Sequence, residues 1–288
     1  MTFCREIHRN VKPNGKSRCL MMPIQCQSKT DVSRGNDGRQ FEQPAPVPDN
    51  PKNLALFLDI DGTLLEIVER PELVTVPPAL LQSLERLAGQ LGGALALVTG
   101  RTLANADSLF SGLSLPVGAV HGMERRSYQG AIESAGLAYD LTALRDVLAG
   151  FVSDRPGLLL EDKGRTIALH YRAAPALESE VHAFILEQLF GRTGLALLHG
   201  KMVFEIKPEG ADKGAAIRAF MEEAPFSGRV PVFLGDDTTD EYGFTAVRAL
   251  GGYGYCVGLE RESDARYRLA DVAAVHEWLA RLAKKLER

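Results

Sequence analysis

The chain has 288 residues, of which 45% are hydrophobic, so its length predicts about two domains with enough apolar residues to form real cores. A net charge of −4 argues against nucleic acid as the principal partner, and no apolar run approaches the ~20 residues needed to span a bilayer. The four cysteines are not spaced like a zinc site, and we expect a reduced, cytoplasmic protein.

The first 50 residues differ from the rest of the chain. They carry eight Lys or Arg residues against five acids, show little apolar periodicity, and become proline-rich between Gln43 and Pro48. A segment of this composition buries too little apolar surface to offset the entropy of ordering, so residues 1–50 are predicted to be a disordered tail. The tail lacks the apolar stretch of a signal peptide, although its basic character leaves a targeting or regulatory role open.

The first chemically informative feature is an apolar run that ends in two carboxylates. The run Leu56–Leu58 leads directly into Asp59, and Asp61 follows one residue later. Alternate residues of an extended segment point to the same side, so both carboxylates can meet where a buried strand ends. The carboxyl ends of parallel strands are where such folds bind ligands. An ordinary turn at Asp61-Gly62 would also fit this local pattern.

A second strand pattern, Ala94–Val98, is followed by Thr99, Gly100 and Arg101 and then by a helical pattern over Thr102–Phe110. A hydroxyl and free backbone amides at the start of a helix form a natural seat for a phosphate. These three residues are therefore candidates for binding the phosphate and the substrate. On its own, the segment also fits a plain helix cap.

The middle of the chain predicts a compact inserted unit. After a short hairpin, the expected order is helix, two strands, helix, two strands, over residues 140–153, 157–163, 165–172, 175–190, 195–199 and 201–207. This αββαββ order can form a four-stranded sheet with two helices on one face. The other face of that sheet would be free.

Alternation along these strands separates apolar from polar side chains. The apolar side is expected to contain Ile167, Leu169, Tyr171, Met202, Phe204 and Ile206. The free face is expected to contain Glu161, Lys163, His170, Arg172, Lys201 and Glu205. Such a face can hydrogen-bond sugar hydroxyls, and it equally fits the solvated side of a half-buried sheet.

The segment Gly210–Gly214 opens another helical pattern with one apolar face. Lys213 would lie in its first turn, where a cation opposes the helix dipole. A nearby phosphate or carboxylate cluster would explain this placement, and so would simple exposure to solvent.

A second acidic cluster follows another buried-strand pattern, Val230–Leu234. Asp236, Asp237 and Asp240 come directly after it. Two strands that both end in carboxylates are expected if those ends meet around a hard cation, and Mg²⁺ needs only one or two carboxylates plus a substrate phosphate. Asp236 could instead cap the next helix, but capping explains one acid and not the whole cluster.

Taken in order, these signals resemble the haloacid dehalogenase superfamily of phosphotransferases, over roughly residues 54–275. Its pattern is Asp-x-Asp-Gly-Thr, then Thr or Ser after a second strand, then Lys, then Gly-Asp-Asp-x-x-Asp. The resemblance implies an α/β fold with a Rossmann-like parallel-sheet core, built from residues 51–135 and 208–288. It also implies that residues 136–207 form an αββαββ cap domain of the C2 type, which sets substrate specificity.

The same resemblance implies roles for the motif residues. Asp59 would be the nucleophile that forms an aspartyl-phosphate, and Asp61 the general acid and then the general base. Thr99 and Lys213 would bind the phosphate. Mg²⁺ would be held by Asp59, Asp236 and the backbone carbonyl of Asp61, with Asp237 and Asp240 in support.

The motifs of the predicted cap narrow the resemblance from a superfamily to one family. These motifs are similar to those of the trehalose-6-phosphate phosphatase family: Glu161-Asp162-Lys163, His170-Tyr171-Arg172 and Gly200-Lys201-x-x-x-Glu205. This implies hydrolysis of trehalose 6-phosphate to trehalose and phosphate, the last step of trehalose biosynthesis. It also implies that the disaccharide is held by Glu161, Lys163, Arg172, Lys201 and Glu205. Thr99 stands where the family more often has Ser, which keeps the hydroxyl.

Two alternatives remain from the sequence. A phosphatase for another sugar phosphate, such as sucrose-phosphate or mannosyl-phosphoglycerate, would share the core and differ in the polar face of the cap. A sugar-phosphate sensor without activity would require the loss of Asp59 or Asp61, and both are present. The expected partner is thus a small-molecule sugar phosphate, with no nucleic acid and no membrane, and a monomer is the expected state.

Overall fold

The computed structural model describes residues 45–68, 74–134, 139–258 and 261–288. Residues 1–44 of the predicted tail lie outside the described residues. For residues 45–50 the prediction of a disordered tail is wrong. Ala45 is buried, and the carbonyl oxygen of Pro46 accepts hydrogen bonds from the Tyr255 hydroxyl (2.6 Å) and the Trp278 indole nitrogen (3.0 Å). Buried Tyr and Trp donors need a partner, and this segment supplies one.

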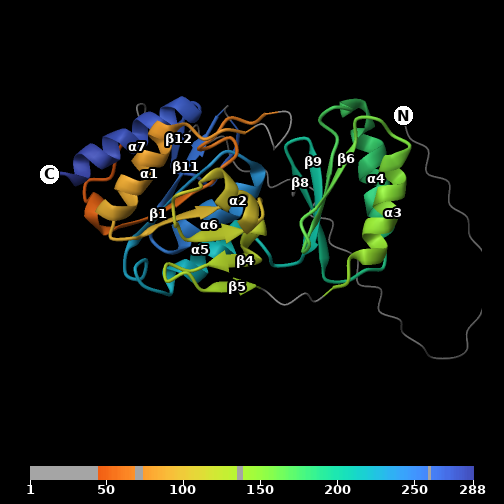
Figure 1. The fold of residues 1–288 in the computed structure, drawn as a ribbon, viewed down its shortest axis with the longest axis horizontal. Coiled ribbons are helices and arrows are strands. Elements are labelled where there is room, and N and C mark those ends of the chain that lie inside the picture. Colours follow the sequence, from red (N-terminus) through yellow and green to blue (C-terminus); the bar gives the residue numbers. More distant parts are fainter. Residues whose placement is uncertain (1–44, 69–73, 135–138, 259–260) are drawn as a thin grey trace, which may run out of the picture. The chain divides into compact units, whose positions relative to one another are not determined.

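The core contains one eight-stranded sheet (Figure 1). Its strands are β1 (Leu54–Leu58), β2 (Leu95–Val98), β3 (Val117–Ala119), β4 (Glu124–Arg126), β5 (Ile132–Ser134), β10 (Val230–Gly235), β11 (Tyr253–Val257) and β12 (Tyr267–Leu269). They lie in the order β12-β11-β10-β1-β2-β3-β4-β5, and all neighbouring pairs from β12 to β3 are parallel. The predicted parallel α/β core is confirmed.

Five helices accompany this sheet in the described part of the core: α1 (Pro78–Gln90), α2 (Leu103–Leu109), α5 (Lys213–Met221), α6 (Glu241–Ala249) and α7 (Val272–Leu286). Helix α1 lies beside α7, and α5 lies beside α6 (Figure 1). Three helix starts are fixed by side-chain caps, since Thr102, Asp212 and Asp271 each accept a hydrogen bond from a backbone amide three residues later. Across the described residues, no helix has both the length and the apolar content required to cross a bilayer.

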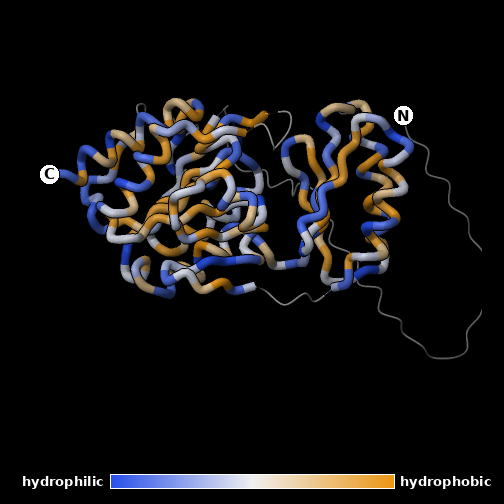
Figure 2. Tube along the Cα trace, in the orientation of Figure 1, coloured by the Kyte–Doolittle hydropathy of each residue, from blue (hydrophilic) through white to orange (hydrophobic). Residues whose placement is uncertain are grey.

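Strand β1 lies at the centre of the sheet, and this position explains why its sequence is continuously apolar. All five of its residues are buried, as expected for a parallel strand covered on both faces. In Figure 2 the hydrophobic colour is concentrated in the interior of the core. Leu58 is in register with Leu234 of β10 and Leu97 of β2. The residues that follow these three strands therefore emerge at one edge of the sheet, as predicted for the two acidic clusters.

The inserted unit has the predicted αββαββ order. Its elements are α3 (Thr142–Ser153), β6 (Leu159–Asp162), β7 (Ile167–His170), α4 (Glu178–Leu189), β8 (Leu195–Gly200) and β9 (Val203–Pro208), with a short 3-10 helix η4 (Pro175–Leu177) before α4. The strands form an antiparallel sheet in the order β6-β7-β9-β8. This unit has a hydrophobic cluster of its own, separate from that of the core.

The predicted alternation in the cap is correct for most positions. Ile167, Leu169, Tyr171, Phe204 and Ile206 are buried in the cap cluster, which also contains buried residues of α3 and α4. Met202 was expected among them, and this is wrong. It is 39% exposed with φ of 64°, because Lys201 and Met202 form the tight turn between β8 and β9 and do not continue the strand.

Candidate active site

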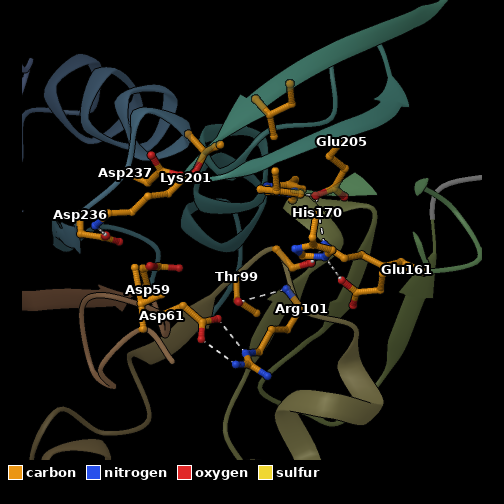
Figure 3. A pocket seen from close by; sticks show the side chains of 18 of the residues that line it. Asp59, Asp61, Thr99, Arg101, Glu161, His170, Lys201, Glu205, Asp236 and Asp237 are labelled. Carbon is orange, nitrogen blue, oxygen red and sulfur yellow. Dashed lines mark hydrogen bonds and ion pairs between the residues drawn. The ribbon is translucent and has the colours of Figure 1, made fainter. Parts of the chain in front are cut away.

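One pocket collects nearly all the residues that the sequence predicts for the site. It is lined by the carboxyl ends of the central core strands and by the polar face of the cap (Figure 3). The predicted residues that line it are Asp59, Asp61, Thr99, Gly100, Arg101, Glu161, Lys163, Arg172, Lys201, Glu205, Lys213, Asp236 and Asp237. Asp240 lies beneath the pocket and is completely buried.

Asp59 and Lys213 form a buried ion pair at the base of the pocket. Each residue is 4% exposed, and the Lys213 Nζ donates to Asp59 Oδ1 at 2.6 Å and to Asp240 Oδ1 at 2.7 Å. Burial alone would lower the pKa of Lys213, but the two carboxylates raise it above its ordinary value. The position of this cation in the first turn of α5 is thus explained by carboxylates, and the alternative of solvent exposure is wrong.

Asp240 organises the second acidic cluster. Its Oδ2 accepts hydrogen bonds from the backbone amides of Asp236 and Asp237, both at 2.9 Å. Asp237, in turn, caps the short 3-10 helix η5 (Thr238–Asp240) through a hydrogen bond from the Thr238 amide. Asp236 is therefore not the helix cap, and its carboxylate is left to line the pocket.

The acidic residues fit a hard cation. Asp59, Asp236 and Asp240 each offer one carboxylate oxygen, and these oxygens lie within 4.8 Å of one another. Burial, followed by the charge of Asp240, raises the pKa of Asp236 to about 7, and burial also raises the pKa of Asp59. Carboxylates crowded in this way are short of positive charge, and oxygen ligands of this kind suit Mg²⁺.

Gly62 allows the two acidic segments to approach each other. Its φ is 81°, and a Cβ atom at this position would lie 2.2 Å from Asp236 Oδ2. A side chain here would clash with the carboxylate and would also strain the backbone. Gly62 is thus part of the site geometry as well as of a turn.

Asp61 and Arg101 form a two-point ion pair. The Arg101 Nε donates to Asp61 Oδ2 at 2.7 Å, and a terminal guanidinium nitrogen donates to Oδ1 at 2.6 Å. This fork geometry fixes the orientation of the carboxylate. The sequence predicts that Arg101 binds the substrate, whereas in the structure its guanidinium holds Asp61 and Asn105. Since Thr102 is the cap of α2, Thr99 is not a helix cap, and its hydroxyl lines the pocket.

Glu205 is the best-connected acid of the cap. Its Oε1 accepts from the Thr166 hydroxyl at 2.5 Å, and its Oε2 lies 3.0 Å from Lys163 Nζ and 3.2 Å from His121 Nε2. Burial would raise the pKa of Glu205, but the charges of Lys163 and His121 and the hydrogen bonds hold it below its usual range. Sequence reasoning missed His121, and the available signal was its position directly after a third core strand.

The other predicted cap residues differ in their contacts: Glu161 pairs within the cap, whereas Lys201 approaches a core aspartate. Glu161 Oε2 lies 2.9 Å from His170 Nε2; burial opposes ionisation of Glu161, but His170 and Lys163 hold its pKa below its usual value. Lys201 is exposed in its turn, and its Nζ lies 3.6 Å from Asp236 Oδ2. The prediction that Lys201 and Glu205 share one strand face is therefore wrong, although both line the pocket.

Comparison with known proteins agrees with this geometry. The family profile described as Trehalose-phosphatase matches residues 57–273. The chain is 47% identical over 208 residues to a probable trehalose-phosphate phosphatase of Sinorhizobium fredii, covering 72% of this chain and 78% of that protein. It is 43% identical over 246 residues to the trehalose-6-phosphate phosphatase of Escherichia coli, covering 84% of this chain and 91% of that protein.

Solved structures show the same fold. A trehalose-6-phosphate phosphatase related protein superimposes with a TM-score of 0.66 at 28% identity, covering 80% of this chain and 97% of that one. The C-terminal domain of the Candida albicans trehalose-6-phosphate phosphatase gives a TM-score of 0.71 at 20% identity, covering 81% and 92% of the two chains. This chain therefore belongs to the trehalose-phosphatase family and has the fold of the haloacid dehalogenase superfamily.

Proposed function

We propose that this protein hydrolyses trehalose 6-phosphate to trehalose and phosphate, as the last step of trehalose biosynthesis. The observation that carries the proposal is the pocket in which a buried Asp59–Lys213 pair faces the polar side of the cap sheet. The core offers a nucleophile and charge for a phosphate, and the cap offers donors and acceptors for sugar hydroxyls. Family membership supports the same substrate.

Asp59 is the proposed nucleophile. A carboxylate oxygen attacks phosphorus, the bond from phosphorus to the sugar oxygen breaks, and an aspartyl-phosphate forms, which divides the transfer into two easier steps. Asp61 gives its proton to the departing sugar oxygen and takes a proton from the water that then releases phosphate. Arg101 holds the ionised Asp61 carboxylate through both of its oxygens, so this ion pair opens before Asp61 carries the proton for the departing oxygen.

The phosphate is bound by the base of the pocket. Lys213 supplies a buried positive charge, and Thr99 and Gly100 supply a hydroxyl and a backbone amide at the end of β2. Asp59 and Asp236, with Asp240 in support, would hold Mg²⁺, which would offset the negative charge that the nucleophile and the phosphate bring together. The proposed Mg²⁺ set also includes the backbone carbonyl of Asp61, while its side chain is held by Arg101.

The disaccharide is held by the polar residues of the cap. Ionised acids on this face accept hydrogen bonds from hydroxyls, and the basic residues donate them. The residues proposed for this role are Glu161, Lys163, Arg172, Lys201 and Glu205. A cytoplasmic location and a monomeric state stay predictions from the sequence.

A panel of sugar phosphates tests the proposal. Phosphate release is measured for trehalose 6-phosphate, sucrose 6-phosphate, mannosyl-phosphoglycerate and glucose 6-phosphate, with p-nitrophenyl phosphate as a substrate that has no sugar. We expect the highest kcat/KM for trehalose 6-phosphate, because a site built to hydrogen-bond hydroxyls rejects substrates that leave its buried groups unpaired. A higher kcat/KM for another sugar phosphate would replace the proposed substrate.

A further inference from the structure

His121 connects the core to a buried glutamate of the cap. It lies in the short 3-10 helix η3 (Val120–Gly122), which follows β3, and its side chain is 7% exposed. Its Nε2 lies 3.2 Å from Glu205 Oε2 on strand β9 of the cap. Since the pKa of Glu205 is held low, the glutamate is ionised and can only accept, so Nε2 is the donor.

The backbone at His121 is held in an unusual conformation. Val120 has φ of 46° and His121 has φ of 55° and ψ of 35°, and a β-branched residue such as Val rarely adopts positive φ. Two hydrogen bonds hold this turn, from the Val120 amide to the Arg101 carbonyl (2.9 Å) and from the His121 amide to the Thr99 carbonyl (3.1 Å). Such backbone strain persists where the surrounding structure fixes it, and it concentrates at functional sites.

The imidazole also packs against the phosphate-binding loop. A Cβ atom at Gly100 would lie 2.8 Å from His121 Cε1, so the ring occupies space that only glycine leaves open. Lys163 of the cap donates from its Nζ both to the Gly100 carbonyl oxygen and to Glu205 Oε2, each at 3.0 Å. His121, Lys163 and the Gly100 carbonyl thus join the cap glutamate to the core loop on which the phosphate would rest.

Glu205 retains capacity for a further hydrogen bond. A carboxylate has about four acceptor positions, and Thr166, Lys163 and His121 use three of them. Thr166 and Lys163 belong to the cap, and His121 belongs to the core. The orientation of the carboxylate is therefore set from both domains at once.

We propose that His121 is a positioning residue for specificity, which orients Glu205 from the core so that the cap glutamate can accept a hydrogen bond from a sugar hydroxyl. The inference rests on the proposed function, because it assigns Glu205 to the sugar. It predicts that loss of His121 impairs turnover of the sugar phosphate far more than turnover of a phosphate without a sugar.

Two substitutions separate positioning from folding. Asn tolerates positive φ as His does, but its side chain is shorter, so His121→Asn keeps the turn and loses the contact with Glu205. His121→Gln has a longer side chain whose amide can donate in place of Nε2. We expect His121→Asn to lower kcat/KM for trehalose 6-phosphate at least about tenfold, His121→Gln to recover part of the loss, and p-nitrophenyl phosphate to change less than about threefold.

A double-mutant cycle with Glu205→Gln tests whether His121 acts through the glutamate. If it does, adding His121→Asn to Glu205→Gln lowers kcat/KM for trehalose 6-phosphate much less than it does in the wild type. Additive losses, a parallel loss with both substrates, or no loss in His121→Asn would each overturn the inference. If the wild type prefers another sugar phosphate, the proposed substrate fails, and the same cycle on that sugar phosphate still tests His121.

Discussion

The acids of the core and the acids of the cap are placed in opposite electrostatic environments. In the core, burial and mutual repulsion raise the pKa values of Asp59 and Asp236. In the cap, neighbouring donors and positive charges outweigh burial and hold the pKa values of Glu161 and Glu205 low. The core site is thus short of positive charge, which suits a divalent cation that would in turn offset the charge of a phosphate, whereas the cap acids are already neutralised and can accept from neutral hydroxyls.

Under the proposed function, this difference assigns the chemistry to the core and the selection of the sugar to the cap. The strongest test within the core is the pair of aspartates that follow β1. Asp59→Asn should abolish turnover and phosphoenzyme formation, because an amide is a poor nucleophile. Asp61→Asn should lose ~10²–10⁴-fold in kcat and still form the phosphoenzyme, because the nucleophile remains. Rapid-quench trapping of the phosphoenzyme from both variants checks this, and equal trapping would contradict the assigned roles.

The shortage of positive charge in the core predicts an obligatory divalent cation. Exhaustive chelation should remove activity, and added Mg²⁺ should restore it. Asp236→Asn should weaken Mg²⁺ binding measured by calorimetry, because one of the three clustered carboxylates is lost. Asp271→Asn is the matched control: its carboxylate caps α7 through the Ala274 amide, Asn caps equally well, and Asp271 is not one of the clustered carboxylates, so Mg²⁺ affinity should be retained. Full activity after chelation would show that the cluster has another purpose.

The core also includes the segment that precedes β1, because its Pro46 carbonyl accepts hydrogen bonds from two core side chains. Deleting residues 1–44 should leave the melting temperature of the protein nearly unchanged, since that segment contains few apolar residues. Deleting residues 1–48 removes the Pro46 carbonyl and leaves Tyr255 and Trp278 without this acceptor, at a cost of about 1–3 kcal/mol for each unsatisfied group. Thermal unfolding of the two truncated proteins measures the difference, and equal melting temperatures would mean that these contacts contribute little.

The low pKa of Glu205 predicts that this residue contributes less to the stability of the fold at low pH. This effect should be smaller than those described above. A carboxylate whose pKa is lower in the folded state stabilises the protein above its unfolded pKa of about 4.3, and this contribution is lost as the pH falls through the folded value. The difference in unfolding free energy between the wild type and Glu205→Gln should therefore shrink as the pH falls from about 7 to about 3. Denaturant unfolding at several pH values measures it; a difference that grows at low pH would mean that the glutamate is not ionised in the fold.

Much of the fold and the site follows from local patterns. The two acidic clusters meet because their strands are parallel and in register, which the buried runs before Asp59 and Asp236 already indicate. The order of helices and strands in the cap follows from the change between helical and strand patterns of apolar residues. The polar face of its sheet follows from the alternation of side chains along the strands. These features depend on residues close together in the sequence, and for that reason they were predictable.

The features that were missed depend on contacts between distant segments or on turn geometry. Pro46 and Tyr255 are 209 positions apart, and nothing local marks the proline-rich segment as packed. Lys201 leaves the cap strand because the chain turns at Met202 with a positive φ, which a methionine does not signal. The pairing of Arg101 with Asp61 and of His121 with Glu205 likewise joins separate elements whose approach is set by the tertiary fold.

The division of labour between core and cap is tested most directly by one ratio, kcat/KM for trehalose 6-phosphate over kcat/KM for p-nitrophenyl phosphate. Glu161→Gln in the cap should lower this ratio about tenfold or more, because a proposed partner of a sugar hydroxyl, half-buried in the pocket, loses its charge. Asp236→Asn in the core should lower both values and leave the ratio nearly unchanged, and Glu187→Gln on the exposed side of α4 should change neither. An unchanged ratio in Glu161→Gln would contradict the account, since the polar face would then be only the solvated side of a structural sheet.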